Sequence, residues 1–419
     1  MAIKNTTPRA RLASMQDGAL SGAVLVGIGL GVGQVMAYLL SLIAARSLGP
    51  EGYGVFGSML ALLMVGGVLA LGIQAAGAKR IVLAADGVRL RVGSGIVRWS
   101  LTAALGIGVA TVVVSPALSW LLHLGGPWLI ILVAINLAPL TIWGSLLGVA
   151  QGREAFARLA AIYAVVGIGR AVGGIAIVVL TQSLIWTLVG MAVGTWVAVA
   201  ACWILTKPLV DWPGEKLANF RIDVFHATHA LLALFVLTNL DVLLARHFLT
   251  AEQAGLYAAG AVVTKVAFWL PQFVATIAYP RLTDHRRAAT LTKGALAVVL
   301  IGIASVAFVA LFPGFVVTFI GGAAYEDLVS EIWIFAAIGA TFALAQFLLY
   351  SQIAASKRAA IVVLWIATAA LVVLVIAFHA SVLQIALIVL SVALSLSLVG
   401  VVELFFEKSR EGRVAKHAS

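Results

Sequence analysis

Cysteine is nearly absent from this sequence, since Cys202 is the only one among 419 residues. A single cysteine cannot form a disulfide within the chain or build a cysteine-based zinc site. The phosphate-binding pattern G-x-x-x-x-G-K-[ST] is missing too, which excludes ATP hydrolysis by this chain. Any energy that the protein uses must therefore come from a source other than ATP hydrolysis by this chain.

Charged residues are also scarce, at 10% of the chain, whereas 63% of the residues are hydrophobic. The longest polar stretch between apolar runs, about residues 206–224, is too short to hold a folded domain. A soluble enzyme is therefore excluded. A membrane-embedded glycosyltransferase or lipid-modifying enzyme would need clustered acids or histidines at a membrane face, and no such cluster is present. We predict no enzymatic activity and no cofactor.

Long apolar runs fill almost the whole chain. A helix needs about 20 residues to cross a hydrocarbon core roughly 30 Å thick, and twelve runs reach that length. Membrane strands would alternate apolar and polar residues, whereas a run such as 361–378 is apolar on every face. We predict an all-α polytopic membrane protein with transmembrane helices at about residues 18–45, 53–78, 94–122, 127–150, 159–181, 184–205, 225–246, 254–280, 292–320, 331–351, 359–379 and 383–405.

The basic residues predict the side on which each loop lies. A formal net charge of +11 would fit nucleic-acid binding, but Lys and Arg gather in alternate loops, which instead indicates membrane topology. Such loops stay cytoplasmic, so we predict a cell-membrane protein with both termini cytoplasmic, basic loops that contact membrane lipids, and no nucleic-acid partner. The predicted cytoplasmic loops hold Lys4, Arg9, Arg11, Lys79, Arg80, Arg89, Arg91, Arg153, Arg158, Lys207, Lys216, Arg221, Arg281, Arg286, Arg287, Lys293, Lys357, Arg358, Lys408, Arg410, Arg413 and Lys416, and the opposite loops only Arg46 and Arg246.

The central polar stretch divides the chain into two predicted six-helix bundles, residues 1–212 and 213–419, both starting on the cytoplasmic side. Equal halves in one orientation are parallel repeats, related by a pseudo-two-fold axis along the membrane normal. The loop after the first span matches the loop after the seventh with one inserted residue, pairing Arg46 with Arg246, Gly54 with Gly255 and Phe56 with Tyr257. The alternative is that any outer hairpin uses glycine and an interfacial aromatic residue.

The same two stretches resemble a known family. The run 45–56 (Ala-Arg-Ser-Leu-Gly-Pro-Glu-Gly-Tyr-Gly-Val-Phe) resembles the first hairpin of the Wzx-type flippases, the polysaccharide-transporter branch of the multidrug/oligosaccharidyl-lipid/polysaccharide exporter superfamily. The run 238–258 resembles that branch's seventh helix and the loop after it. The resemblance implies alternating-access flipping of undecaprenyl-pyrophosphate-linked oligosaccharides for polysaccharide biosynthesis. An ion-coupled antiporter of drugs or other small molecules from the same superfamily is the alternative, although basic residues inside the spans argue against it.

Basic residues inside the predicted spans are the first candidate site. A charge at the bilayer centre costs about 2.5–3.5 kcal/mol on insertion scales, so such residues are functional candidates by default. Arg170 and Lys265 lie near the middle of the fifth and eighth spans, and Arg98 lies near the cytoplasmic end of the third. A cationic cavity would attract a pyrophosphate headgroup. The alternatives are static pairing of Arg170 and Lys265 with a buried acid or helix carbonyls, and snorkelling of Arg98 to the interface.

Asp241 is the most deeply placed acid in the sequence. It either binds and releases a proton or sodium ion or forms a static pair with Arg170, Lys265 or Arg246. Asn239, two residues away, is predicted to point to a different face of the helix, because neighbours two residues apart diverge.

Two further polar residues, Asn136 and Gln272, lie near prolines within their spans, at positions that are either hinges or cavity walls or simple packing kinks.

We interpret several glycine pairs and two histidines as structural residues without a role in chemistry. Glycine pairs let helices approach closely, and the candidate pairs are Gly27 with Gly31, Gly29 with Gly33, Gly169 with Gly173, and Gly190 with Gly194. His226 and His229, at the start of the seventh span, have no cysteine or acidic cluster nearby, so no metal site is predicted.

Overall fold

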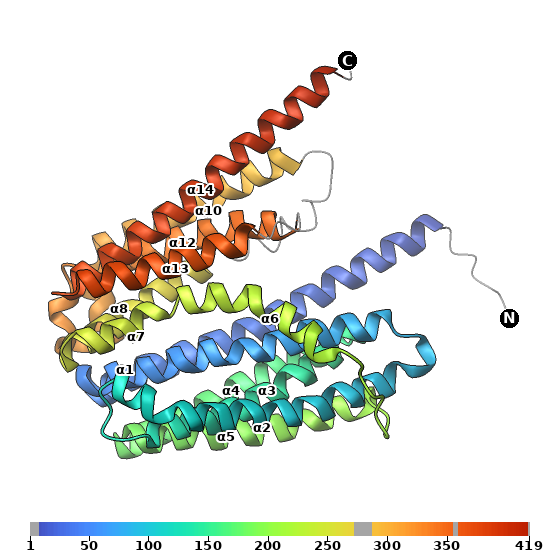
Figure 1. Cartoon of the computed structure of the whole chain (residues 1–419), viewed down its shortest axis with the longest axis horizontal. Helices are drawn as coiled ribbons and strands as arrows, with labels where there is room; N and C mark the ends of the chain where they lie inside the picture. Colours follow the sequence, from blue (N-terminus) through green and yellow to red (C-terminus); the bar gives the residue numbers. More distant parts are fainter. Residues whose placement is uncertain (1–7, 272–286, 355–358, 418–419) are drawn as a thin grey trace. The chain divides into compact units, whose positions relative to one another are not determined.

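The computed structural model describes residues 8–271, 287–354 and 359–417, and these residues contain helices and no strand. The predicted all-α class is confirmed. The helices shown in Figure 1 are α1 (Pro8–Leu83), α2 (Arg89–Leu121), α3 (Trp128–Gly152), α4 (Phe156–Thr181), α5 (Leu184–Thr206), α6 (Phe220–Leu237), α7 (Leu240–Phe248), α8 (Ala251–Trp269), α10 (Arg287–Leu311), α11 (Pro313–Ile320), α12 (Ile332–Ala354), α13 (Ala359–Ala377) and α14 (Val382–His417), with short 3-10 helices η1 (Asp86–Val88), η2 (Lys207–Leu209) and η4 (Gly322–Leu328) between them.

Within the described residues the predicted spans coincide with these helices, and the chain is a multi-pass membrane protein. Residues 272–280 of the predicted eighth span lie outside the described residues. In the described residues, eight helices are long and apolar enough to cross a membrane, or nine if one bent pair counts as a single span. The number is below twelve partly because α1 contains the first two predicted spans. In addition, the apolar segment Ile361–Ala377 within α13 is shorter than 18 residues.

The two arms of α1 meet at Gly49. This residue has φ 67° and ψ 176°, in a region of backbone space that glycine enters without steric cost, and Pro50 follows it. The bend therefore falls between the first two predicted spans, where the sequence placed a loop.

By their internal contacts the residues form two compact units. Unit 1 contains Met1–Ser41, Gly66–Leu118 and Gly126–Leu231, and unit 2 contains Leu42–Val65, Ser119–Gly125 and Leu232–Ser419. The two units are defined by the contacts within them, whereas the predicted bundles 1–212 and 213–419 are defined by two repeated sets of six helices. The two bundles stay a prediction.

Glycines bring the helices of unit 1 together. A Cβ added to Gly144 of α3 would lie 2.3 Å from the carbonyl oxygen of Ala70 in α1, and one added to Gly148 would lie 2.9 Å from that of Gln74. Since Gly144 and Gly148 are one helical turn apart, α3 runs closely along the second arm of α1. This approach brings polar side chains of the two helices within hydrogen-bonding reach.

The packing role predicted for the glycine pairs of α4 and of α5 is confirmed, and the two helices pack against each other. A Cβ on Gly173 would lie 2.2 Å from the carbonyl oxygen of Gly190, and one on Gly194 would lie 2.1 Å from that of Gly169. Only helices without side chains at these positions can approach this closely.

Of the two glycine pairs predicted in the first arm of α1, one packs against α4. A Cβ on Gly29 would lie 2.3 Å from the carbonyl oxygen of Ala160, and one on Gly33 would lie 3.5 Å from that of Tyr163. The packing role predicted for Gly27 and Gly31 finds no support among the described residues, because a Cβ on either would meet no atom of those residues within 4 Å.

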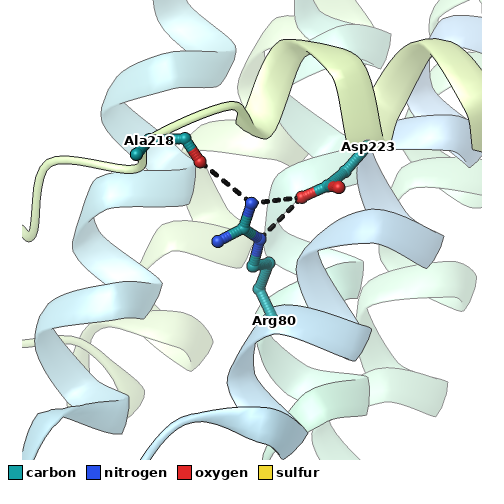
Figure 2. Close-up of polar contacts among 3 residues, drawn as sticks. All are labelled: Arg80, Ala218 and Asp223. Carbon is teal, nitrogen blue, oxygen red and sulfur yellow. Dashed lines mark hydrogen bonds and ion pairs between the residues drawn. The ribbon is translucent and has the colours of Figure 1, made fainter.

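Arg80 ties the end of α1 to the start of α6 within unit 1 (Figure 2). Its Nε donates to Oδ2 of Asp223 at 2.6 Å, and its Nη2 donates to the carbonyl oxygen of Ala218 at 2.9 Å. The Arg80 and Asp223 side chains are 35% and 40% exposed, and ion pairs of this kind contribute about 0–1 kcal/mol to stability. The contact sets the local path of the chain into α6.

In unit 2 the two matched loops of the predicted repeat lie against each other. A Cβ on Gly54 would lie 2.8 Å from the backbone nitrogen of Gly255, and one on Gly255 would lie 1.9 Å from the carbonyl oxygen of Pro50. Phe56 and Tyr257 are both fully buried. The matched aromatic residues therefore belong to the core of unit 2 and not to a membrane interface.

The matched arginines, Arg46 and Arg246, each bind carbonyl oxygens at the end of a helix from the other half of the predicted repeat. Nη2 of Arg46, from the end of the first span, donates to the carbonyl oxygens of Thr318 and Phe319 in the last turn of α11, at 3.0 and 2.9 Å. Nε of Arg246, from the end of the seventh span, donates to the carbonyl oxygen of Leu122, just beyond α2, at 3.1 Å. Helix α2 is the third predicted span, and α10 with α11 is the ninth, which is the equivalent span of the second half. Arg46 of the first half thus binds the end of the ninth span, and Arg246 of the second half binds the end of the third. A pseudo-two-fold repeat predicts this exchange.

Candidate functional site

A break in the predicted seventh span positions Asp241, a buried acid of unit 2. Helix α6 ends at Leu237 and α7 begins at Leu240, and Asn239 between them has φ −132° and ψ −10°. The prediction that Asn239 and Asp241 point to different faces assumed a continuous helix, and the break removes that assumption. Both side chains are buried, with 4% and 5% of their surfaces exposed. Broken helices at membrane depth occur where protein or a water-filled cavity satisfies the freed backbone groups.

Asp241 is held by a tyrosine. The hydroxyl of Tyr257 in α8 donates to Oδ2 of Asp241 at 3.0 Å, and the Tyr257 ring packs edge-on against Phe335 with 5.2 Å between centroids. Asp241 also lies in the first turn of α7, where the helix dipole favours a negative charge. Among the described residues, its Oδ1 and the Oδ1 of Asn239 are buried acceptors without a hydrogen-bond partner.

Lys265, in α8, is half-buried and attracts Asp241 electrostatically. In the described part of the chain the ion pairs within 4.0 Å are Arg80 with Asp223 and Arg89 with Asp86, so Lys265 and Asp241 form no direct pair. Unit 2 thus combines a buried acid, two unpaired acceptor oxygens and a nearby ammonium group.

Arg170 occupies the middle of α4 in unit 1, as the sequence placed it. Its side chain is half-buried, and within the described ranges no carboxylate lies within 4.0 Å of it. The alternative of a static pair with a buried acid therefore finds no partner for Arg170 among those residues. A guanidinium group this deep without a counter-charge is a candidate anion-binding group.

The remaining predicted residues lie in different settings. Arg98 of α2 is exposed. Asn136 of α3 is buried, and its Nδ2 donates to the carbonyl oxygens of Leu132 at 2.9 Å and of Leu188 in α5 at 3.2 Å, so it joins two helices of unit 1. Gln272 lies outside the described residues.

The predicted set does not include a neutral polar cluster in unit 1. Nε2 of Gln74 in α1 donates to Oε1 of Gln151 in α3 and to the hydroxyl of Tyr163 in α4, each at 2.8 Å. The ring of Trp143 meets that of Tyr163 edge-on, with 5.6 Å between centroids. Gln74 within the predicted second span was a signal, but only the packing of α1 against α3 shows its partners.

Two other features lie apart from these residues. An open groove of about 400 Å³ in unit 1 is lined by Gly22, Leu25 and residues 154–158, and none of the predicted site residues borders it. The described residues contain no group of three or more His, Cys, Asp or Glu side chains that could hold a metal ion.

Comparison with solved structures places this fold among membrane transporters. The inward-facing conformation of a multidrug resistance MATE family transporter of the MOP superfamily has a TM-score of 0.66 and 13% identity, covering 94% of this chain and 100% of that one. The outward-facing conformation of a multidrug resistance MATE family transporter has a TM-score of 0.65 and 14% identity, covering 94% of this chain and 96% of that one. The lipid II flippase MurJ, in an inward closed conformation, has a TM-score of 0.73 and 12% identity over 92% and 87%.

Sequence comparison adds nothing to this likeness, since no protein-family model and no curated protein matches the chain. At identities of 12–14% the structural similarity shows the fold alone. The chain has the fold shared by these multidrug transporters and this flippase.

Proposed function

We propose that this chain is a flippase that moves an undecaprenyl-pyrophosphate-linked oligosaccharide across the cytoplasmic membrane by alternating access, for polysaccharide biosynthesis. The observation that carries the proposal is Arg170, a cation in the middle of α4 with no carboxylate within 4.0 Å among the described residues. Such a group attracts an anionic headgroup into a region of low dielectric constant. A pyrophosphate supplies the missing negative charge.

Each basic candidate has a defined role. Arg170 and Lys265 each offer a positive charge to the pyrophosphate during transport, and Arg98, exposed on α2, receives the headgroup at the predicted cytoplasmic side. The fold likeness to MurJ, a lipid II flippase, supports a lipid-linked substrate. Both termini lie on the cytoplasmic side in this proposal, as the basic loops predict.

Ion coupling is assigned to the break between α6 and α7. The unpaired Oδ1 atoms of Asn239 and Asp241 are costly to bury without a donor or a cation. A proton on Asp241, or a sodium ion bound by both oxygens, removes this cost, and discontinuous membrane helices commonly form such sites. Binding and release of the ion would couple transport to its gradient.

A second candidate is an ion-coupled antiporter of drugs or other small molecules. The fold likeness to two MATE family structures favours it, and so does Asp241 as a buried acid that could exchange a proton against a cationic drug. The unpaired cation at Arg170 argues for the anionic substrate instead.

Reconstitution of the purified chain in liposomes separates the two functions. We expect it to move a fluorescently labelled polyprenyl-pyrophosphate oligosaccharide between leaflets, measured by enzymatic access to the glycan from outside. Cationic dyes should not be taken up under the same conditions. Dye uptake driven by an ion gradient, with no glycan flipping, would establish the antiporter and reject the flippase.

A further inference from the structure

The neutral cluster of unit 1, formed by Gln74, Gln151 and Tyr163, is a candidate site for a second part of the substrate. Three helices contribute to it, since Gln74 comes from α1, Gln151 from α3 and Tyr163 from α4. We infer that these side chains bind a sugar ring of the transported glycan, an inference that rests on the proposed flippase function.

The hydrogen bonds inside the cluster leave donors available. Gln74 directs its amide nitrogen at both partners, but the amide nitrogen of Gln151 donates to no other group in the described part of the chain, and its side chain is exposed. An amide both donates and accepts, and a phenol does the same. The cluster can therefore bind the hydroxyl or acetamido groups of a sugar.

Helix α4 connects this cluster to the proposed headgroup site. Tyr163 and Arg170 are seven residues apart, so their side chains project from nearly the same face of the helix. At 1.5 Å per residue the separation along the axis is about 10 Å. A pyrophosphate on Arg170 thus leaves the sugars attached to it within reach of Tyr163.

The chemistry of the cluster favours a sugar over a cationic drug. Gln74, Gln151 and Tyr163 are uncharged, and no acid belongs to their hydrogen-bond network. The edge-on contact with Trp143 holds the Tyr163 ring in place and keeps an aromatic surface beside the polar groups. Polar groups that fix orientation next to an aromatic surface are the usual composition of a small-molecule site.

The test compares three probes in detergent: polyprenyl pyrophosphate, and the same lipid carrying N-acetylglucosamine or galactose. We expect Gln151→Ala and Tyr163→Phe to weaken binding of at least one glycan-bearing probe about tenfold and to leave the bare pyrophosphate unchanged. Ser145→Ala is the matched control, because it removes a buried hydroxyl bond to Ser100, 2.9 Å long, between two helices of the same unit.

Each other result has a meaning. If the wild-type chain binds none of the probes, the flippase proposal fails and the subsite with it. If the wild type binds the probes but the variants weaken all three equally, or weaken none, the cluster is a structural tie and only the sugar subsite is rejected. Weaker binding of the glycan-bearing probes alone in Ser145→Ala would also reject the sugar subsite.

The exchanged arginine contacts of unit 2 carry a second, independent inference. Arg46 and Arg246 are the only basic residues of the predicted outer loops, and both bind carbonyl oxygens at helix ends. His247 adds to the second contact, since its Nδ1 lies 2.6 Å from the carbonyl oxygen of Leu121. The geometry points to a latch, formed by Arg46 and Arg246, that closes the predicted outer side and must open during transport.

The physical basis is the same at both arginines. The last carbonyl groups of a helix lack partners within the helix and carry its negative dipole end, so a guanidinium group binds them well. Alternating access requires one side of the protein to open while the other is closed. Because the matched arginines hold matched helices, release of both contacts opens the outer ends symmetrically.

Distance measurements between spin labels test the latch. Labels at Gln182→Cys and Ser381→Cys, in a Cys202→Ala background, report on two predicted outer loops. We expect Arg46→Ala and Arg246→Ala to raise, several-fold, the fraction of molecules in which the two labels are separated by the longer distance. Arg89→Ala is the control, since Nε of Arg89 also binds a carbonyl oxygen, that of Ala84 at 3.1 Å, but on the predicted cytoplasmic side. Unchanged populations in the folded double variant, or an equal change in the control, would reject the latch.

Discussion

Arg170→Ala is expected to reduce glycan-lipid flipping about ten- to hundredfold in proteoliposomes. Hydrogen bonds to charged groups contribute about 1.5–3 kcal/mol, and a tenfold change in an equilibrium corresponds to about 1.4 kcal/mol. Arg170 has no carboxylate within 4.0 Å in the described residues, so its replacement leaves no buried acid uncompensated there. The variant should therefore fold, and the loss should lie in transport.

Companion variants separate headgroup binding from other effects. Arg170→Lys should retain part of the activity because the charge remains, although a lysine cannot form the bidentate contact. Lys265→Ala should also reduce flipping, whereas Arg91→Ala, which removes an exposed basic residue at the start of α2, should not. Flipping at the wild-type rate in both Arg170→Ala and Lys265→Ala, at equal amounts of folded protein, would refute the cationic headgroup site.

Hydrophobicity alone located most of the helices, because a run of about 20 apolar residues has few other stable conformations in a membrane. Some breaks had local signals. Gly49 and Pro50 mark the bend of α1, and Pro313 marks the point where the predicted ninth span divides into α10 and α11. The break before Leu240 had none, since neither proline nor glycine occurs between Leu237 and Leu240. After the break, the hydrogen bond from Tyr257 to Asp241 holds the first turn of α7.

The candidate site was predictable only where a residue reveals itself by its charge. Arg170, Lys265 and Asp241 stand out because ionised groups are rare in membrane spans. Gln74 stands out as a polar residue within its span, but its hydrogen bond to Tyr163 depends on which helices are neighbours, which no single segment encodes. For the same reason the packing of Gly169 against Gly194 was foreseeable as a type of contact but not as a pair.

Asp241→Asn is expected to abolish the dependence of flipping on an ion gradient, with the substrate still moving along its own gradient. Asparagine has nearly the shape of a protonated aspartate and can accept the hydrogen bond of Tyr257, but it cannot release a proton or hold a sodium ion by charge. The measurement is the flipping rate in proteoliposomes with and without an imposed proton or sodium gradient.

Tyr257→Phe is the matched control, because it removes the 3.0 Å hydrogen bond and leaves the carboxylate in place. This variant should keep gradient-dependent flipping, with an altered ion concentration for half-maximal rate, since Oδ2 of Asp241 loses its donor. If Asp241→Asn responds to the gradient as the wild type does, Asp241 does not couple transport to an ion, and its orphan oxygen is only a cost of the helix break. If instead both variants lose gradient dependence alike, the tyrosine bond and not the charge is what the coupling requires.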